Sequence, residues 1–159
     1  MLTLLRDLRT LRRELALPAP DRTRSLAVRH VYAGSCNGCE HELTMAAGPH
    51  YDLQRFGFGI VASPRHADVL LVTGIVTTRM RAPLLSAYDA MPEPRRVVAF
   101  GDCALGCNVL GLGSELAGPV EEILPVDLRI PGCPPTPDAV AAGLIELCDR
   151  PLVLGLDDD

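Results

Sequence analysis

The feature that most constrains this chain is a pair of cysteines, Cys36 and Cys39, separated by two residues. The pair follows an apolar run at 26–34 whose alternation and β-branched residues predict a strand. Two thiols at this spacing can face one metal centre, because the two intervening residues let the chain fold back on itself. The pair alone is ambiguous, since redox-active pairs, zinc sites and iron–sulfur sites all use it.

Two further cysteines stand at predicted strand ends. Cys103 follows a strand expected at 95–100, and Cys133 follows one expected at 125–130. Strands that alternate with helices predict a doubly wound, mostly parallel α/β sheet of the flavodoxin-like kind, and such sheets carry their sites at the carboxyl ends of the strands. We therefore expect four cysteines from three loops to meet at one edge of the sheet.

Other elements complete this pattern. Further strands are expected at 56–61 and 67–74, with helices at 40–47, 79–91 and 137–149. The run at 67–74 is apolar on both faces, as in a buried parallel strand. We expect Pro83 to interrupt the second helix near its start.

Composition excludes several classes of function. The chain has 159 residues, a net charge of −5, 4% aromatic residues and no Trp, which argues against nucleic acid as a partner. No apolar run approaches the roughly 20 residues of a membrane span, and the N-terminus lacks the order of a signal peptide. We expect a cytosolic or peripheral protein, in which cysteines are metal ligands rather than disulfides.

Residues 1–20 are expected to form a separate unit, ahead of an iron–sulfur domain at 21–159. Leucines at 4, 8, 11 and 15, with arginines among them, predict a basic amphipathic helix, followed by a proline-containing linker. Such a helix can lie on an anionic membrane, dock on a partner subunit or pack on its own domain.

Four cysteines can hold zinc or an iron–sulfur cluster. Zinc sites usually draw on two close pairs, whereas here two ligands come singly from distant strands, which favours one [4Fe-4S] cluster. Cys107, four residues beyond Cys103, is a reserve ligand, and Cys148 is expected to be a core thiol. A zinc-stabilised scaffold stays open as an alternative.

Six charged residues could line the cluster or a subunit interface, although surface or helix-capping roles are equally open for each. They are Glu40, Glu42, Arg65, His66, Arg79 and Arg81.

Several motifs together resemble one family. They are Cys-Asn-Gly-Cys-Glu at 36–40, Ser-Pro-Arg-His-Ala-Asp-Val-Leu-Leu-Val-Thr-Gly at 63–74, Met-Arg-Ala-Pro at 80–83, Met-Pro-Glu-Pro-Arg at 91–95, Gly-Asp-Cys-Ala at 101–104 and Val-Asp-Leu-Arg-Ile-Pro-Gly-Cys-Pro-Pro-Thr-Pro at 126–137. The chain is similar to the small subunit of membrane-associated, energy-converting [NiFe] hydrogenases, including formate hydrogenlyase. It is also similar to the homologous cluster-bearing subunit of respiratory NADH:quinone oxidoreductase. The spacing Cys-x-x-Cys resembles the hydrogenase branch, because the quinone-reducing branch has adjacent cysteines.

The resemblance implies an electron-transfer subunit without hydrogen chemistry of its own. By that resemblance Cys36, Cys39, Cys103 and Cys133 ligate one [4Fe-4S] cluster, which relays electrons between ferredoxin-like subunits and the [NiFe] site of a large subunit. It also implies membrane subunits in the same complex and a peripheral position on the cytoplasmic side of the membrane. A quinone- or sulfur-reducing relative of complex I is the alternative within the family.

Overall fold

A computed structural model describes residues 25–108, 111 and 113–149 of the chain. Within these ranges five strands form one sheet in the order β2-β1-β3-β5-β7, and every neighbouring pair is parallel. The strands are β1 (Leu26–Tyr32), β2 (Phe58–Ile60), β3 (Val69–Thr73), β5 (Arg96–Phe100) and β7 (Leu128–Ile130). The predicted doubly wound, parallel α/β fold is confirmed. The predicted N-terminal helix and linker at 1–20 lie outside the described residues.

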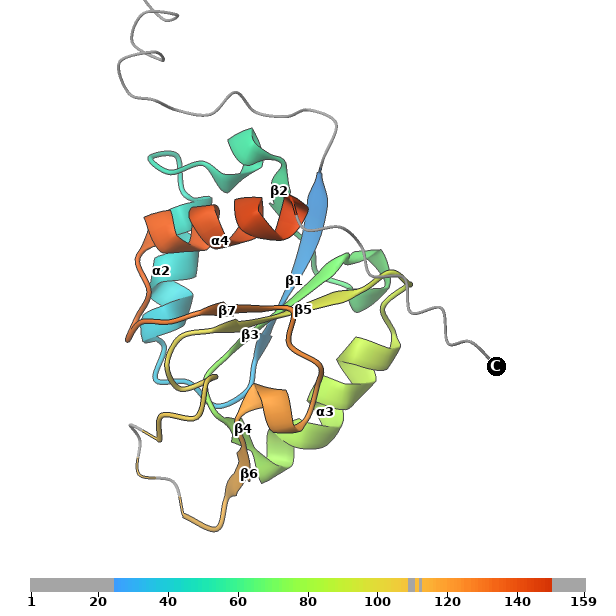
Figure 1. The fold of residues 1–159 in the computed structure, drawn as a ribbon, viewed down its shortest axis with the longest axis vertical. Helices are drawn as coiled ribbons and strands as arrows, with labels where there is room; N and C mark the ends of the chain where they lie inside the picture. The colour runs from blue at the N-terminus through green and yellow to red at the C-terminus, as the bar shows by residue number, and fades with distance from the viewer. Residues whose placement is uncertain (1–24, 109–110, 112, 150–159) are drawn as a thin grey trace, which may run out of the picture.

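Helices cover both faces of the sheet (Figure 1). α2 (Gly38–Ala47) and α4 (Pro137–Asp149) pack on one face, and α3 (Thr78–Asp89) packs on the other. The three helices match the predicted ones to within a few residues. α3 continues through Pro83, so the predicted interruption of this helix is wrong. None of the helices in the described ranges has the length and apolar character needed to cross a membrane.

The core lies on both sides of β3. All five residues of this strand are buried. Val69 and Leu71 belong to the apolar cluster under α2 and α4, whereas Leu70 and Val72 belong to the cluster under α3. Burying one such side chain contributes about 1.5–3 kcal/mol, which explains why this run is apolar on both faces.

Two strands are shorter than predicted. β2 begins only at Phe58, because residues Leu53–Phe56 form a 3-10 turn, η1, that ends at Gly57 with a positive φ of 91°. β7 begins at Leu128, although Asp127 already donates its N–H to the carbonyl of Val97 at 2.9 Å. Both strands lie at an edge of the sheet, where pairing exists on one side only.

Some short elements were not predicted from the sequence. β4 (Val76–Thr77) and β6 (Leu116–Gly118) form a small antiparallel pair beyond the end of β3. Two further 3-10 turns are η2 (Pro64–His66) and η3 (Val120–Glu122). These segments are too short for a hydrophobic period to be read from the sequence.

Candidate functional site

The cysteine-bearing loops lie at the carboxyl edge of the sheet. Cys36 follows β1, Cys103 follows β5 and Cys133 follows β7, while Cys39 lies in the first turn of α2. Cys39 and Cys103 are buried, and Cys36 and Cys133 are exposed. The loops thus leave the sheet where the sequence predicted.

Close contacts tie the first loop to the other two. Cys39 Sγ lies against the turn after β5, because a Cβ atom on Gly101 would be 2.6 Å from this sulfur. A Cβ atom on Gly38 would be 3.6 Å from Cys36 Sγ and 3.8 Å from the Cβ of Pro134, which belongs to the loop after β7. The three loops therefore form one compact group.

Burial and nearby negative charge act on the thiol of Cys39. Burial, together with the negative charges of Glu40, Cys103, Cys36 and Cys133, raises the pKa of Cys39 to about 12. The thiolate of Cys39 is therefore costly to form without a cation nearby. A positively charged centre that binds all four cysteines would offset this cost, because metal ligation requires the thiolate form.

Asp102 links the loop of Cys103 to that of Cys133. Its carboxylate Oδ1 accepts the N–H of Gly132 at 2.7 Å, and its own N–H donates to the carbonyl of Gly132 at 2.8 Å. Gly101 N–H donates to the carbonyl of Ile130 at 2.8 Å. These bonds extend the pairing of β5 and β7 beyond the strands and hold the two loops side by side.

Glu40 connects the first loop to β3. Ser35 Oγ donates to Glu40 Oε2 at 2.6 Å, and Thr73 Oγ1 donates to Glu40 Oε1. Thr73 Oγ1 also lies 2.9 Å from His30 Nε2, which in turn is 3.7 Å from Glu40 Oε1. A partly buried polar network thus adjoins the segment that carries Cys36 and Cys39.

Two groups in this network, Glu40 and His30, both have lowered pKa values, for different reasons. Burial alone would raise the pKa of Glu40, but the hydrogen bonds from Ser35 and Thr73 outweigh it, with help from His30, and lower the pKa. Burial lowers the pKa of His30 despite the opposing effect of Glu40. Near neutral pH the network therefore contains a carboxylate and a neutral imidazole.

The other charged residues expected near the site are dispersed. Glu42 lies on α2, and the exposed Arg79 and Arg81 lie in the first turn of α3, beyond the carboxyl end of β3. None of these three side chains forms a hydrogen bond or ion pair that joins it to the cysteine loops within the described part of the chain.

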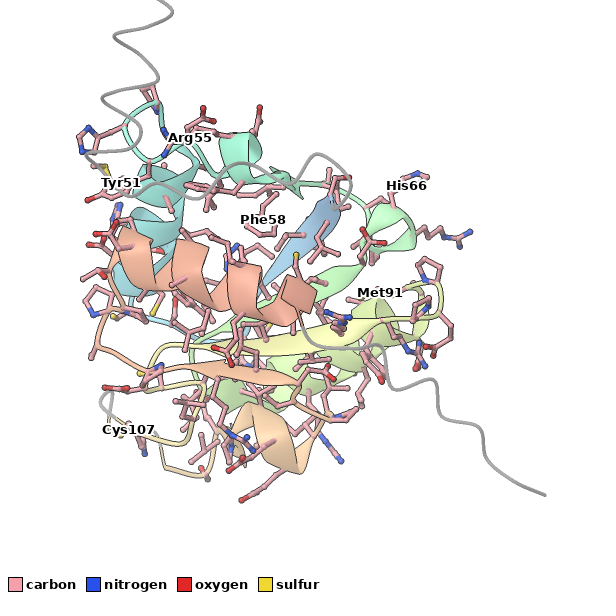
Figure 2. The ribbon with its side chains drawn as sticks, turned by 45° about the horizontal axis from the view of Figure 1, so that its top comes forward. Tyr51, Arg55, Phe58, His66, Met91 and Cys107 are labelled. Atoms are coloured by element: carbon pink, nitrogen blue, oxygen red, sulfur yellow. The ribbon has the colours of Figure 1, made fainter. Side chains whose placement is uncertain are left out.

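Arg65 and His66 lie elsewhere. They belong to η2, which precedes β3, so they are at the amino edge of the sheet, opposite the cysteines. Figure 2 shows His66 and Cys107 far apart on the molecule. The structure thus does not bring Arg65 or His66 to the cysteine edge.

Cys107, the reserve ligand, follows the loop of Cys103. It is exposed, and its N–H donates to the carbonyl of Asp102 at 2.9 Å. Its backbone is thus tied to the loop that carries Cys103.

Four thiols form a donor set suited to zinc or to an iron–sulfur cluster. Over the residues that the structure describes, no group of three or more His, Cys, Asp or Glu side chains is arranged to hold a single metal ion. A [4Fe-4S] cluster does not require its ligands to converge on one ion, because each thiolate binds a different iron atom. The four cysteines are therefore compatible with the cluster as ligands.

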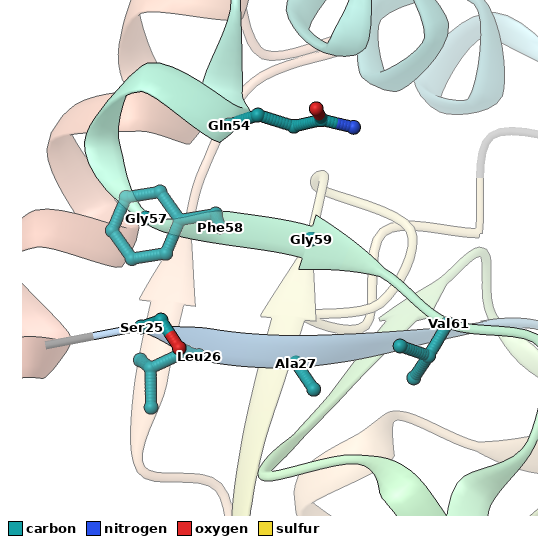
Figure 3. Close-up of a pocket in the computed structure, with 8 residues that line it drawn as sticks. All are labelled: Ser25, Leu26, Ala27, Gln54, Gly57, Phe58, Gly59 and Val61. Atoms are coloured by element: carbon teal, nitrogen blue, oxygen red, sulfur yellow. The ribbon is translucent and has the colours of Figure 1, made fainter.

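An open pocket lies away from this chemistry. Figure 3 shows it beside the edge strand β2, between Gln54 of η1, Phe58 and the beginning of β1 at Leu26. Its lining contains no cysteine, histidine or charged residue. The cysteine edge, rather than this pocket, is the candidate site.

Sequence reasoning missed four residues that organise the site. They are His30, Ser35, Thr73 and Asp102. Ser35 and Asp102 adjoin cysteines, which is a weak local signal. His30 and Thr73 reach the network only through the pairing of β1 with β3, in which His30 is opposite Leu71 and Tyr32 is opposite Thr73.

Comparisons with known proteins place the chain in a family. The family described as NADH ubiquinone oxidoreductase, 20 Kd subunit, matches residues 36–147. The probable membrane-bound hydrogenase subunit mbhJ of Pyrococcus furiosus is 45% identical over 122 residues, covering 77% of this chain and 73% of the relative. Formate hydrogenlyase subunit 7 of Escherichia coli is 45% identical over 132 residues, covering 77% of this chain and 51% of that protein. The chain thus spans about half the length of the latter relative.

A solved structure is similar in both sequence and fold. It is that of the membrane-bound sulfane sulfur reductase, an archaeal respiratory membrane complex. The match has a TM-score of 0.69 and 32% identity, and covers 80% of this chain and 70% of the other.

Proposed function

Because the chain belongs to the family of the NADH ubiquinone oxidoreductase 20 Kd subunit, we propose that it is the electron-transfer small subunit of a membrane-associated [NiFe] hydrogenase complex. The resemblance inferred from the motifs is confirmed by the membrane-bound hydrogenase and formate hydrogenlyase relatives. These relatives are subunits of oxidoreductase complexes. The role of relay within such a complex is our proposal for this chain.

One observation carries the proposal: the loops that bear four cysteines follow β1, β5 and β7 at one edge of the sheet and pack against one another, with Cys39 Sγ against Gly101 and with Cys36 Sγ and Pro134 both next to Gly38. We assign Cys36, Cys39, Cys103 and Cys133 as the ligands of one [4Fe-4S] cluster. When bound, such a cluster accepts and releases single electrons. Cys107 is left out of the ligand set, because four thiolates complete the ligation of one cluster.

The chain itself supplies ligation, burial and orientation. Cys39 and Cys103 lie on the buried side of the site, whereas Cys36 and Cys133 lie on the exposed side. The exposed side is where a partner subunit could approach within reach of electron transfer. We propose that the partners are a [NiFe]-hydrogenase-like large subunit, a ferredoxin-like iron–sulfur subunit and membrane subunits, with this chain peripheral on the cytoplasmic side.

Hydrogen activation belongs, in this proposal, to the partner large subunit. The cysteine edge offers thiols, a carboxylate and a neutral histidine, but its function is to hold a relay rather than to bind substrate. Purified chain without its partners should therefore neither evolve nor oxidise hydrogen. Hydrogen turnover by the isolated chain would contradict this division of roles.

The similarity to the sulfane sulfur reductase structure favours a second candidate within the family, a sulfur-reducing complex that uses the same kind of subunit. The sequence of the large subunit separates the two, because a [NiFe] site needs two terminal cysteine pairs there. A zinc-stabilised scaffold is the remaining alternative. It would lack the visible absorption of an iron–sulfur protein.

The test uses the anaerobically purified complex. Low-temperature EPR of the dithionite-reduced wild type is compared with Cys36→Ser and with Cys107→Ser, a matched removal of an exposed thiol. We expect one [4Fe-4S] signal to be lost or altered with Cys36→Ser and kept with Cys107→Ser. If the signal were lost in Cys107→Ser and kept in Cys36→Ser, the ligand assignment would be rejected.

A further inference from the structure

Both oxygens of the Glu40 carboxylate accept hydrogen bonds from side-chain hydroxyls, which an acidic residue in the first turn of a helix does not need. Ser35 and Thr73 each have one hydroxyl proton, and both protons point to the two oxygens of this carboxylate. Ser35 Oγ accepts from the N–H of Asn37 at 3.3 Å. Thr73 Oγ1 has its own proton on Glu40, so it accepts from His30 Nε2. Each hydroxyl is thus fixed from both sides, which strengthens and orients its bond to the carboxylate.

Within the described residues, the charge of Glu40 has no permanent cation beside it. Its one ion-pair contact in these ranges is His30 Nε2 at 3.7 Å, and His30 is neutral near pH 7 because burial lowers its pKa. No arginine in the described ranges forms an ion pair with Glu40. The carboxylate therefore acts on its surroundings as a negative charge that is only partly screened, since its side chain is 18% exposed.

The carboxylate of Glu40 is tied to the loop that carries the first two cysteines. Glu40 and Cys39 are adjacent, and the bond between Ser35 and Glu40 closes the segment 35–40 that carries both Cys36 and Cys39. The carboxylate is thus held on the same short segment as two of the proposed ligands.

We propose that Glu40 is a positioning residue whose fixed negative charge lowers the reduction potential of the cluster held by the four cysteines. This inference rests on the proposed function. Reduction adds one electron, and hence one negative charge, to a centre that already lies beside a carboxylate. Repulsion between the two makes reduction less favourable, and net charge near a cluster is one of the factors that set its potential.

The test is a redox titration of the intact complex followed by EPR, with the midpoint potential of this cluster as the readout. Glu40→Gln removes the charge and keeps the length of the side chain. Glu42→Gln is the matched control. It removes the same charge two residues farther along α2, and within the described residues Glu42 forms no hydrogen bond or ion pair with the cysteine loops. Glu40→Gln should shift the midpoint to a more positive potential, while Glu42→Gln should leave it near the wild-type value.

A third variant, Ser35→Ala, keeps the charge but removes one of the two hydroxyls that hold it. The carboxylate can then move toward solvent, so its effect should weaken without vanishing. The expected order of midpoints, from most negative to most positive, is wild type, Ser35→Ala and Glu40→Gln. If the Glu40→Gln complex contains no cluster, the midpoint potential of Ser35→Ala is compared with that of wild type. A more positive midpoint then supports the role of Glu40, and an unchanged midpoint rejects it.

The outcomes separate this inference from the proposed function. A wild-type complex without a [4Fe-4S] signal from this chain would reject the proposed function itself. A wild-type signal together with an unchanged midpoint in Glu40→Gln would reject only the role of Glu40. An equal positive shift in Glu42→Gln would also reject it, because the effect would then be one of overall charge.

Discussion

Gly101 provides a sharp test of the packing at the cysteine edge, through the variant Gly101→Ala. Gly101 follows β5 with a φ of +90°, a conformation that L-residues rarely adopt. A Cβ atom at this position would be 2.6 Å from Cys39 Sγ. The variant therefore combines backbone strain with displacement of a proposed ligand.

The two effects have different magnitudes and different readouts. The backbone term is about 1–2 kcal/mol, the usual cost of the left-handed conformation for a residue with a Cβ. For a chain of this size it corresponds to a fall in Tm of roughly 2–8 °C. The contact with the sulfur is relieved when the Cys39 side chain rotates away, which lowers stability little but moves a ligand out of place. Cluster content should therefore fall by more than stability does.

The assay compares wild type, Gly101→Ala and Gly113→Ala. Gly113 is a suitable control, because a Cβ atom there would meet nothing within 4 Å and its φ is not positive. Thermal unfolding measures the stability, and iron with acid-labile sulfide measures the cluster. Wild-type stability and wild-type iron content in Gly101→Ala would refute the packing described for this loop.

Two more predictions concern residues that sequence reasoning missed. Asp102→Ala leaves the N–H of Gly132 without its acceptor at 2.7 Å, so the free energy of unfolding should fall by about 1–3 kcal/mol in urea titrations. The control Asp138→Ala, at an exposed position, should change this free energy little. Equal free energies of unfolding in the two variants would contradict the linking role of Asp102. Burial lowers the pKa of His30 below its ordinary value of 6.5. The unfolded chain then binds more protons than the folded one, so stability should decrease as pH falls below about 6.5. His30→Gln should flatten this part of the curve of urea midpoint against pH, and an unchanged curve would show that His30 does not cause the dependence.

Much of the fold was predictable because the hydrophobic pattern agrees with the topology. The run at 67–74 predicted a strand buried on both faces, and β3 occupies Val69–Thr73 with every residue buried. Edge strands were predicted less well. β2 and β7 have three residues each, and their neighbouring segments are turns that local pattern does not separate from strand.

The candidate site was predictable in part, for a topological reason. Parallel strands end at one edge, so cysteines that follow β1, β5 and β7 had to lie near one another. The network around Glu40 could not be foreseen, since Thr73 is 33 residues away along the chain and its spacing from Glu40 carries no local signal. Arg65 and His66 precede β3 rather than follow it, which is why the structure places them at the opposite edge.

The central claim is that four cysteines from three loops hold one [4Fe-4S] cluster. Metal and sulfide analysis of the anaerobically purified complex, combined with Mössbauer spectroscopy of iron-57-enriched protein, tests it most directly. The account predicts iron and acid-labile sulfide in the equal amounts that a [4Fe-4S] cluster requires, with the share due to this chain lost in a Cys36→Ser, Cys133→Ser double variant. Zinc bound by these cysteines, or an iron content unchanged in the double variant, would contradict it.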